Sequence, residues 1–279
     1  MEKLRKALEK VKKEIEEEKP EPELKHVTPE PSTALPGKVS PVYTQSQTYE
    51  VDPLFLIDRH CIGISSEAME IEFYKMLRTQ IIQRTGPNGW NTIMITSALP
   101  GEGKTLTAIN LALTFSREFN HTVLLVDCDL RQQQIHKMMG LPGERGLIDA
   151  LLDNRPLQEI IVWPGIEKLT VISGGRTIKE SSELLSSPKM KSLVSEIKSR
   201  YPDRYVFFDV PPILSAADAV AFSPLVDSIL MVVQANKTSI QDVKKACDLI
   251  PREKFLGFVL NRHKIPSKSY TEYYYPKAS

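Results

Sequence analysis

The chain has 279 residues, of which 41% are hydrophobic and 25% are charged, and its formal net charge is +1. This length is enough for one α/β domain with appendages, whereas the near-neutral charge argues against a broad nucleic-acid-binding surface. No apolar run approaches the roughly 18 residues of a membrane-spanning helix, and the charged N-terminus is unlike a signal peptide, so we expect a soluble, cytoplasmic chain.

Two segments precede the expected globular part. Residues 1–19 consist mostly of Lys, Arg and Glu, with apolar residues at coiled-coil spacing, which predicts a charged helix that is either solvated or docked on a partner. Residues 20–53 contain seven of the twenty prolines and read as a disordered linker. The folded part is therefore expected to begin near Leu54.

From residue 66 onward, helical and strand patterns alternate. A helix from residue 66 carries Met69, Phe73, Met76, Leu77 and Ile81 on one side. Strands are expected near 91–97, 122–127, 168–172, 204–209, 226–233 and 255–261, and further helices near 104–118, 131–139, 146–153, 188–199, 216–222 and 238–250. Because several strands are continuously apolar, both of their faces should be covered, which predicts an α/β fold with a doubly wound, mostly parallel sheet.

The cysteines add little to this picture. Cys61, Cys128 and Cys247 are widely spaced and form neither a zinc-binding pattern nor a CxxC motif. We expect three buried or half-buried thiols in a reducing compartment.

A phosphate-binding pattern follows the strand at 91–97. Residues 98–105 read Ala-Leu-Pro-Gly-Glu-Gly-Lys-Thr and match G-x-x-x-x-G-K-[ST] except at the first position. In such a loop Gly101 and Gly103 let the backbone approach phosphate oxygens, and the following helix N-terminus favours an anion. Lys104 would reach the β- and γ-phosphates, and Thr105 would offer its hydroxyl to Mg²⁺. The alternative is an ordinary glycine turn before a helix.

Acidic residues end two further strands. Asp127 ends the strand at 122–127 and Asp129 comes two residues later, and Asp209 ends the strand at 204–209. Carboxylates are the ligands that Mg²⁺ uses together with substrate phosphates, and the carboxyl ends of parallel strands meet at one edge. Each acid alone could instead be a turn residue or a helix cap.

Taken together, these three motifs resemble the bacterial tyrosine kinases (BY-kinases) over about residues 54–279. These enzymes have the P-loop NTPase architecture of the partition ATPases, with a second Walker A-like motif of the form D-x-D-x-R, here Asp127 to Arg131. Related partition and division-site ATPases usually carry a lysine where this chain has Leu99, which favours the kinase branch. The resemblance implies a kinase domain over 54–264 and a flexible tyrosine-rich tail over 265–279.

The resemblance also implies roles for particular residues. ATP and Mg²⁺ are the implied cofactors, with Thr105, Asp129 and Asp209 at the metal and Lys104, Asp127, Asp129 and Asp209 as the catalytic set. Asp127 resembles the acid that accepts the tyrosyl proton. Asn261 and Arg262 resemble the residues that contact the adenine, although an ordinary sheet edge with an Asn turn is the alternative. The implied nucleotide-binding residues are Pro100, Gly101, Glu102, Gly103, Lys104, Thr105, Leu106, Asn261 and Arg262.

The end of the chain supplies candidate phosphate acceptors. Four of the nine tyrosines, Tyr270, Tyr273, Tyr274 and Tyr275, lie in the last ten residues. BY-kinases carry a similar C-terminal cluster that is autophosphorylated in trans, and each phosphate adds about −1.5 to −2 charge. A sticky aromatic tail is the alternative.

A charged triplet in the helix from residue 66 is the candidate self-association surface. Glu72, Lys75 and Arg78 share one helical face at a spacing of three. They resemble the E-x-x-R-x-x-R motif through which these kinases form rings, with lysine in the middle position. A solvated charged face is the alternative.

The resemblance implies an ATP-dependent protein-tyrosine autokinase that regulates exopolysaccharide or capsule biosynthesis and export. Its implied partners are the cytoplasmic tail of a membrane chain-length-determinant protein, which would activate it and recruit it to the inner face of the cell membrane, a second copy of itself, and a tyrosine phosphatase. No nucleic-acid partner is expected. One alternative is an ATP-switched partner-binding ATPase of the partition or division-site type, and another is a nucleotide-binding scaffold without turnover.

Overall fold

One eight-stranded sheet organises the protein. The computed structural model describes residues 47–65, 70–178, 180–201 and 203–263. The strands lie in the order β1-β4-β5-β3-β6-β2-β7-β8. Neighbouring strands are parallel except β4 and β5, which are antiparallel, so the predicted mostly parallel sheet is confirmed. The strands span β1 Gln47–Thr48, β2 Thr92–Ser97, β3 Thr122–Asp127, β4 Ile161–Trp163, β5 Leu169–Ile172, β6 Arg204–Asp209, β7 Ser228–Gln234 and β8 Phe255–Asn261.

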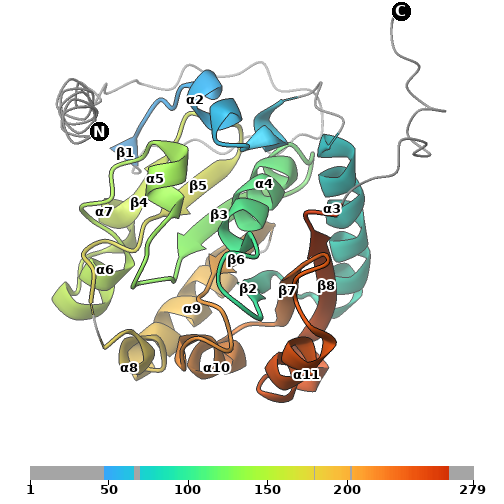
Figure 1. The fold of residues 1–279 in the computed structure, drawn as a ribbon. Helices are drawn as coiled ribbons and strands as arrows, with labels where there is room; N and C mark the ends of the chain where they lie inside the picture. The colour runs from blue at the N-terminus through green and yellow to red at the C-terminus, as the bar shows by residue number, and fades with distance from the viewer. Residues whose placement is uncertain (1–46, 66–69, 179, 202, 264–279) are drawn as a thin grey trace, which may run out of the picture.

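Helices cover both faces of the sheet. One face packs against α2 (Pro53–Asp58), α3 (Ile71–Thr85), α4 (Lys104–Ser116) and α5 (Ile135–Met139). The other packs against α6 (Leu147–Asp153), α7 (Leu157–Ile160), α8 (Ser181–Leu185), α9 (Pro188–Arg200), α10 (Asp218–Phe222) and α11 (Ile240–Asp248). Figure 1 shows α8 to α11 along the lower part of the molecule, with α4 above them. Short 3₁₀ turns complete the set: η1 Ile62–Ile64, η2 Gly86–Asn88, η3 Ser223–Leu225 and η4 Arg252–Lys254.

The strands are continuously apolar because alternate residues enter two separate cores. Phe207 packs into the core beneath α4, whereas Phe208 packs into the core beneath α9 and α10. The same division separates Leu125 from Val126. Burying each of these side chains contributes roughly 1.5–3 kcal/mol, and together they hold the carboxyl ends of β3 and β6 in fixed positions.

The helix predicted at 131–139 is shorter than expected. Residues 128–134 form a loop, and α5 begins only at Ile135. Carboxylate oxygens capture the backbone donors that a helix would use: Asp127 accepts from the Ile135 N–H at 3.1 Å, and Asp129 accepts from the Gln132 N–H at 3.2 Å. Such side-chain bonds compete with helix formation.

The folded domain begins earlier than the expected boundary at residue 54. β1 pairs with β4, and Tyr49 and Val51 are buried in the core beneath α4. Two of the cysteines, Cys61 and Cys128, are buried and the third is half-buried, as predicted.

Several expectations lie outside the described residues. These are the charged helix at 1–19, the linker up to residue 46, the start of the helix at 66–69 and the tyrosine-rich segment from residue 264 onward. Among the helices that are described, none is both long enough and apolar enough to span a bilayer.

Candidate active site

The phosphate-binding loop joins β2 to α4, as the sequence predicts. Gly101 and Gly103 have φ angles of 78° and 93°, a left-handed backbone conformation that residues with a side chain rarely adopt. Lys104 and Thr105 form the first turn of α4, so backbone N–H groups and the positive end of the helix dipole face the loop. The geometry is that of an anion-binding turn rather than an ordinary connection.

Lys104 is the centre of the site. Its ammonium lies 2.9 Å from Asp129 Oδ2, 3.1 Å from Asp209 Oδ1 and 3.2 Å from Thr105 Oγ1. The Lys104 side chain is only 11% exposed. Burial works against its charge, but the carboxylates of Asp209 and Asp129 outweigh burial and raise the pKa of Lys104 to about 12. The ammonium is therefore charged throughout the physiological range.

Three adjacent strands supply this group. β3, β6 and β2 are neighbours in the sheet, and Asp127 pairs with Asp209 across β3 and β6. The Thr105 hydroxyl donates to Asp209 Oδ2 at 2.6 Å. The expected convergence of Lys104, Thr105, Asp129 and Asp209 is thus present in the structure.

Asp127 occupies a different environment from Asp129. It has no exposed surface, and its two oxygens accept from the backbone N–H groups of Asp129 and Ile135, both at 3.1 Å. Burial and the neighbouring charge of Asp209 raise the pKa of Asp127 to about 8. In this conformation Asp127 fixes the loop at 128–134, and it is Asp129 that contacts Lys104.

The donor set fits a nucleotide with a hard cation. No group of three or more His, Cys, Asp or Glu side chains in the described part of the chain forms a metal site by itself. Mg²⁺ does not require one, because it is usually held by one or two carboxylates together with phosphate oxygens and waters. Thr105, Asp129 and Asp209 offer such hard oxygens beside the phosphate-binding loop.

The two residues expected at the adenine lie at the end of β8. The Asn261 side-chain amide donates to the Glu102 carbonyl oxygen at 2.8 Å. The Arg262 guanidinium lies 3.4 Å from the Gln234 side-chain oxygen, and Arg262 itself has a φ of 57°. Both residues therefore lie beside the phosphate-binding loop, on its β7–β8 side.

Arg131 forms contacts that its place in the D-x-D-x-R motif does not reveal. Its Nε donates to Ser181 Oγ at 2.8 Å, and its guanidinium pairs with Asp218 at 3.3 Å. Ser181 and Asp218 are fully buried. The arginine therefore connects the loop after β3 to α8 and α10, contacts for which the sequence contains no local signal.

The candidate ring residues have unequal environments. Lys75 pairs with Glu72 at 2.6 Å on the surface of α3. Arg78 instead donates to the Thr114 carbonyl at 2.8 Å and pairs with Glu118 at 3.1 Å, so it holds α3 against the end of α4. The three residues thus share a helix without sharing one exposed face.

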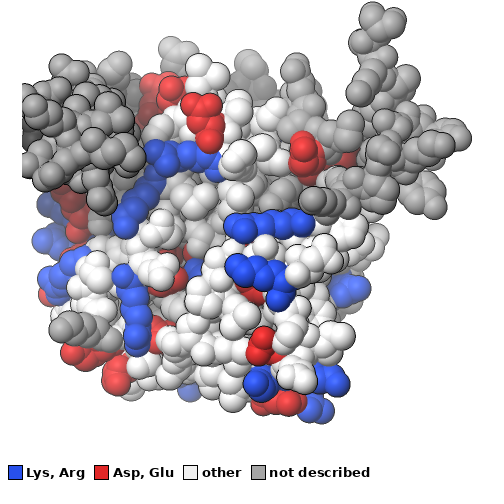
Figure 2. Space-filling view, in the orientation of Figure 1, with Lys and Arg blue, Asp and Glu red and all other residues white. Residues whose placement is uncertain are grey.

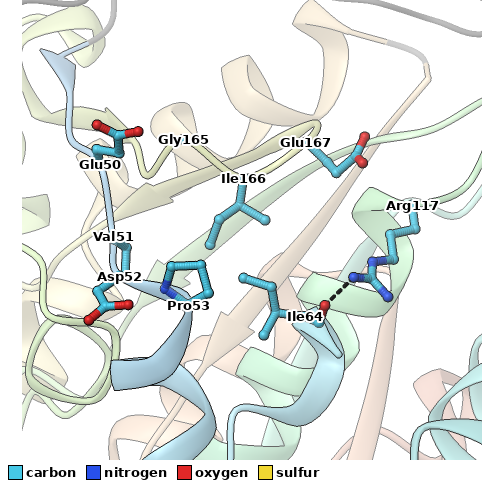
Figure 3. Close-up of a pocket in the computed structure, with 9 residues that line it drawn as sticks. All are labelled: Glu50, Val51, Asp52, Pro53, Ile64, Arg117, Gly165, Ile166 and Glu167. Atoms are coloured by element: carbon cyan, nitrogen blue, oxygen red, sulfur yellow. Dashed lines mark hydrogen bonds between the residues drawn. The ribbon is translucent and has the colours of Figure 1, made fainter. Parts of the chain in front are cut away.

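A cavity of about 550 Å³ lies far from this site (Figure 3). Gly165, Ile166 and Glu167 line it just before β5 begins, and Arg117 follows the C-terminal end of α4. Because the phosphate-binding loop is at the opposite end of α4, this cavity lies at the amino-end edge of the sheet. It is not part of the candidate active site.

Charges on the molecular surface are mixed. In Figure 2 the Lys and Arg side chains of the described residues are interspersed with Asp and Glu, without a continuous basic field on the face shown.

Comparison with known proteins identifies the family. The model of a family described as AAA domain matches residues 90–254, which include all three motifs at the strand ends. The chain is 34% identical over 221 residues to the tyrosine-protein kinase YwqD of Bacillus subtilis, covering 78% of this chain and 92% of that one. The chain belongs to the bacterial tyrosine-protein kinase family. Its membership confirms the resemblance drawn from the motifs.

Solved structures agree with this assignment. The kinase resembles the crystal structure of the chimerical protein CapA2B2 with a TM-score of 0.67 and 30% identity, covering 77% of this chain and 92% of that one. It shares its fold more distantly with the septum site-determining protein MinD of Pyrococcus horikoshii, solved with Mg-ADP, at a TM-score of 0.50 and 24% identity, with 62% and 70% covered. The kinase branch is thus the nearer of the two.

Proposed function

We propose that this protein is an ATP-dependent protein-tyrosine autokinase that phosphorylates the tyrosines at 270, 273, 274 and 275 of a neighbouring copy. The observation that carries the proposal is the buried group of Lys104, Thr105, Asp129 and Asp209 at the end of a phosphate-binding loop. It supplies a fixed cation, a hydroxyl and two carboxylates, which suit a triphosphate and Mg²⁺.

In the proposed reaction the tyrosyl oxygen attacks the γ-phosphorus, the bond from the γ-phosphorus to the β–γ bridging oxygen breaks, and ADP leaves with that electron pair. Lys104 would bind the β- and γ-phosphates and offset the charge that develops on them. Thr105, Asp129 and Asp209 would hold Mg²⁺, which when bound neutralises phosphate charge. The loop and α4 N-terminus would orient the donor for attack.

The tyrosyl proton needs an acceptor, because a free tyrosine has a pKa of about 10. We assign this role to Asp127. Asp127 lies beside Asp209 at the end of β3. Burial and the charge of Asp209 raise the pKa of Asp127, and a raised pKa makes its carboxylate a stronger base once it is ionised. Since Asp127 has no exposed surface in this structure, proton transfer requires the loop at 128–134 to move when ATP and the acceptor bind.

The described tyrosines are poor acceptors, which favours the C-terminal cluster. Tyr49 and Tyr205 are buried, and the Tyr205 hydroxyl is hydrogen-bonded to Thr85 at 2.8 Å. Tyr74 is half-buried. Tyr201 is exposed, but the Arg204 guanidinium stacks over its ring with its central carbon 4.1 Å from the centroid.

Family membership supports a proposal for the wider role of the kinase in the cell. We propose that the kinase regulates exopolysaccharide or capsule biosynthesis and export, and that the cytoplasmic tail of a membrane chain-length-determinant protein activates it. This partner would bring it to the inner face of the cell membrane, and a tyrosine phosphatase would reverse the modification. Family membership supports this part of the proposal, and the geometry of the site supports the chemistry.

The first test is phosphotyrosine formation by the purified full chain with Mg-ATP. Lys104→Met should abolish the signal, and a chain stopped before Tyr270 should lose most of it, whereas Tyr201→Phe should behave like the wild type. ATP hydrolysis without phosphotyrosine, even with the activating tail added, would favour the partition-type ATPase. A signal that survives truncation would place the acceptors elsewhere.

A mixing experiment tests transfer between copies. A full-length Lys104→Met chain, which has the acceptors but no donor site, is mixed with an active chain truncated before Tyr270. Phosphotyrosine on the Lys104→Met chain is the expected result. If neither chain is labelled while the wild type is, transfer occurs within one copy.

The proton acceptor is tested by comparing Asp127→Asn with Asp129→Asn. Loss of Asp127 should lower turnover by about 10²–10⁴-fold with little effect on ATP binding. Loss of Asp129 should weaken binding of Mg-ATP itself. If Asp127→Asn keeps its turnover, the acid serves only to hold the loop.

A further inference from the structure

Glu102 is an unexpected residue in a loop that binds phosphates, because its carboxylate has the same sign of charge as the ligand. In the structure, the hydrogen bonds of this carboxylate go to the loop itself, to β7 and to the segment after β7. Glu102 is 2% exposed. One oxygen, Oε2, accepts from the Leu99 N–H at 2.7 Å and closes the loop on itself.

The other oxygen of Glu102 reaches the neighbouring strand. Oε1 accepts from the Gln234 N–H at 3.3 Å, at the end of β7, and from the Thr238 hydroxyl. Thr238 directly precedes Ser239, the N-cap residue of α11. A single buried side chain thus connects the phosphate-binding loop to β7 and to the segment that leads into α11.

A second link joins the loop to β8. The Asn261 amide donates to the Glu102 carbonyl at 2.8 Å. A Cβ atom at Gly103 would come within 2.2 Å of the Asn261 amide nitrogen, so the absence of a side chain at Gly103 makes this approach possible. The backbone and the side chain of Glu102 therefore hold the loop against the ends of β7 and β8 together.

We propose that Glu102 is a positioning residue that fixes the phosphate-binding loop relative to the ends of β7 and β8. The inference rests on the proposed function, in which the loop binds the phosphates of ATP and the end of β8 lies beside the adenine. Holding the loop and the end of β8 at a fixed separation lets one ATP molecule bind to both without rearrangement. Glu102 acts through Leu99, Gln234 and Thr238 and does not contact the nucleotide.

This role predicts a specific pattern of binding. Glu102→Ala should weaken binding of ADP and of a non-hydrolysable ATP analogue about tenfold, the loss expected for one or two charge-assisted hydrogen bonds. Inorganic tripolyphosphate, which has no adenine to align, should lose less affinity than ADP, because only the bond to Leu99 lies within the phosphate-binding loop. Thr238→Val should reproduce part of the effect with Glu102 intact, and the two changes should be non-additive.

The control is a buried acid with a purely local bond. Asp149 caps α6 by accepting from the Gly146 N–H at 2.7 Å, and Asp149→Asn should lower the melting temperature while leaving nucleotide affinity unchanged. All affinities are measured by titration calorimetry, which requires no phosphotransfer, so failure of the kinase proposal would not affect the readout. If Glu102→Ala lowers only the melting temperature, or weakens tripolyphosphate as much as ADP, the positioning role is wrong.

Discussion

At the scale of single residues, the Lys104 ammonium has two alternative sets of partners: carboxylates before nucleotide binds, and phosphates afterwards in the proposed mechanism. In this structure its ammonium pairs with Asp129 and Asp209, and these are the groups that the proposed mechanism assigns to the metal. Binding of Mg-ATP would provide phosphates for the ammonium and a cation for the carboxylates. Under the proposed mechanism the residue would contribute to stability before nucleotide binds and to catalysis afterwards.

This dual role predicts that Lys104→Met destabilises the nucleotide-free protein. Removing the cation leaves two buried carboxylates without their ion-pair partner, which costs roughly 3–5 kcal/mol of unfolding free energy. The loss should be measurable by urea denaturation at neutral pH. Adding Asp129→Asn to Lys104→Met should recover part of it, because one unpaired charge is removed. Equal stability of wild type and Lys104→Met would show that the ion pairs contribute nothing.

The residues of this site differ in how far the sequence alone could place them. Lys104 and Thr105 were predictable because they complete a phosphate-binding pattern after β2, and Asp129 and Asp209 because they lie at the carboxyl ends of β3 and β6. The burial of Asp127 was not, because it depends on backbone donors in a loop that the apolar pattern predicted as helix. The contacts of Glu102 were also hidden, since Gln234 and Thr238 are more than 130 residues away along the chain.

At the scale of elements, long strands were predicted more accurately than short ones. The strands predicted at 122–127, 204–209 and 255–261 have the same bounds in the structure. β1, β4 and α7 have only two to four residues each, too few for a period to be recognised. These short elements owe their structure to the partners against which they pack.

The contact between η1 and α4 gives a test of packing. A Cβ atom at Gly63 would lie 2.6 Å from Leu113 Cβ and 2.8 Å from the Asn110 carbonyl oxygen. Gly63→Ala should therefore force η1 away from α4 and lower the unfolding free energy by about 1–3 kcal/mol. Gly86→Ala is the matched control, because a Cβ there meets nothing within 4 Å, and it should be neutral or slightly stabilising. The measurement is the melting temperature of both variants compared with that of the wild type.

Asp227 links the start of β2 to α9 and predicts a pH dependence. Burial opposes its charge, but hydrogen bonds from Lys198, the Thr92 hydroxyl and the backbone N–H groups of Asn91 and Thr92 outweigh burial and lower its pKa. A lowered pKa contributes stability that is complete above the ordinary aspartate pKa of about 4. That contribution is lost as the pH falls through the lowered value.

Asp227→Asn should accordingly cost about 1–2 kcal/mol at neutral pH and progressively less in acid. The measurement is urea denaturation of both proteins between pH 7 and pH 3. A difference that stays constant with pH would show that the charge of Asp227 is not responsible. Glu196→Gln on the exposed side of α9 provides a control, because its pair with Arg200 is solvated and should contribute little.

At the scale of the whole molecule, the surface of α3 is the contact between copies that we propose. Phe73 and Met76 are 40% and 58% exposed, and they lie beside the Glu72–Lys75 pair. Exposed apolar side chains next to a charged pair suit a contact between copies. Arg78 contributes differently, because its bonds to Thr114 and Glu118 hold α3 in place.

We therefore predict that Glu72→Ala combined with Lys75→Ala shifts the sedimentation coefficient toward that of a monomer and reduces transfer between copies, without lowering the melting temperature. Arg78→Ala should lower the melting temperature as well, since it removes contacts within one copy. Sedimentation velocity over a range of concentrations separates the two effects. Unchanged assembly of the double variant would discard this surface.

The strand order has a consequence for how the domain can be held. β1 and β8 occupy the two opposite edges of the sheet, seven interstrand spacings of about 4.8 Å apart. Residue 47, in β1, therefore lies at one flank of the sheet, and residue 263, just after β8, lies at the other. A tether attached at residue 47 would hold the domain by one flank of the sheet. Fluorescent labels placed on the two flanks would then report the orientation of the domain at the tethering surface.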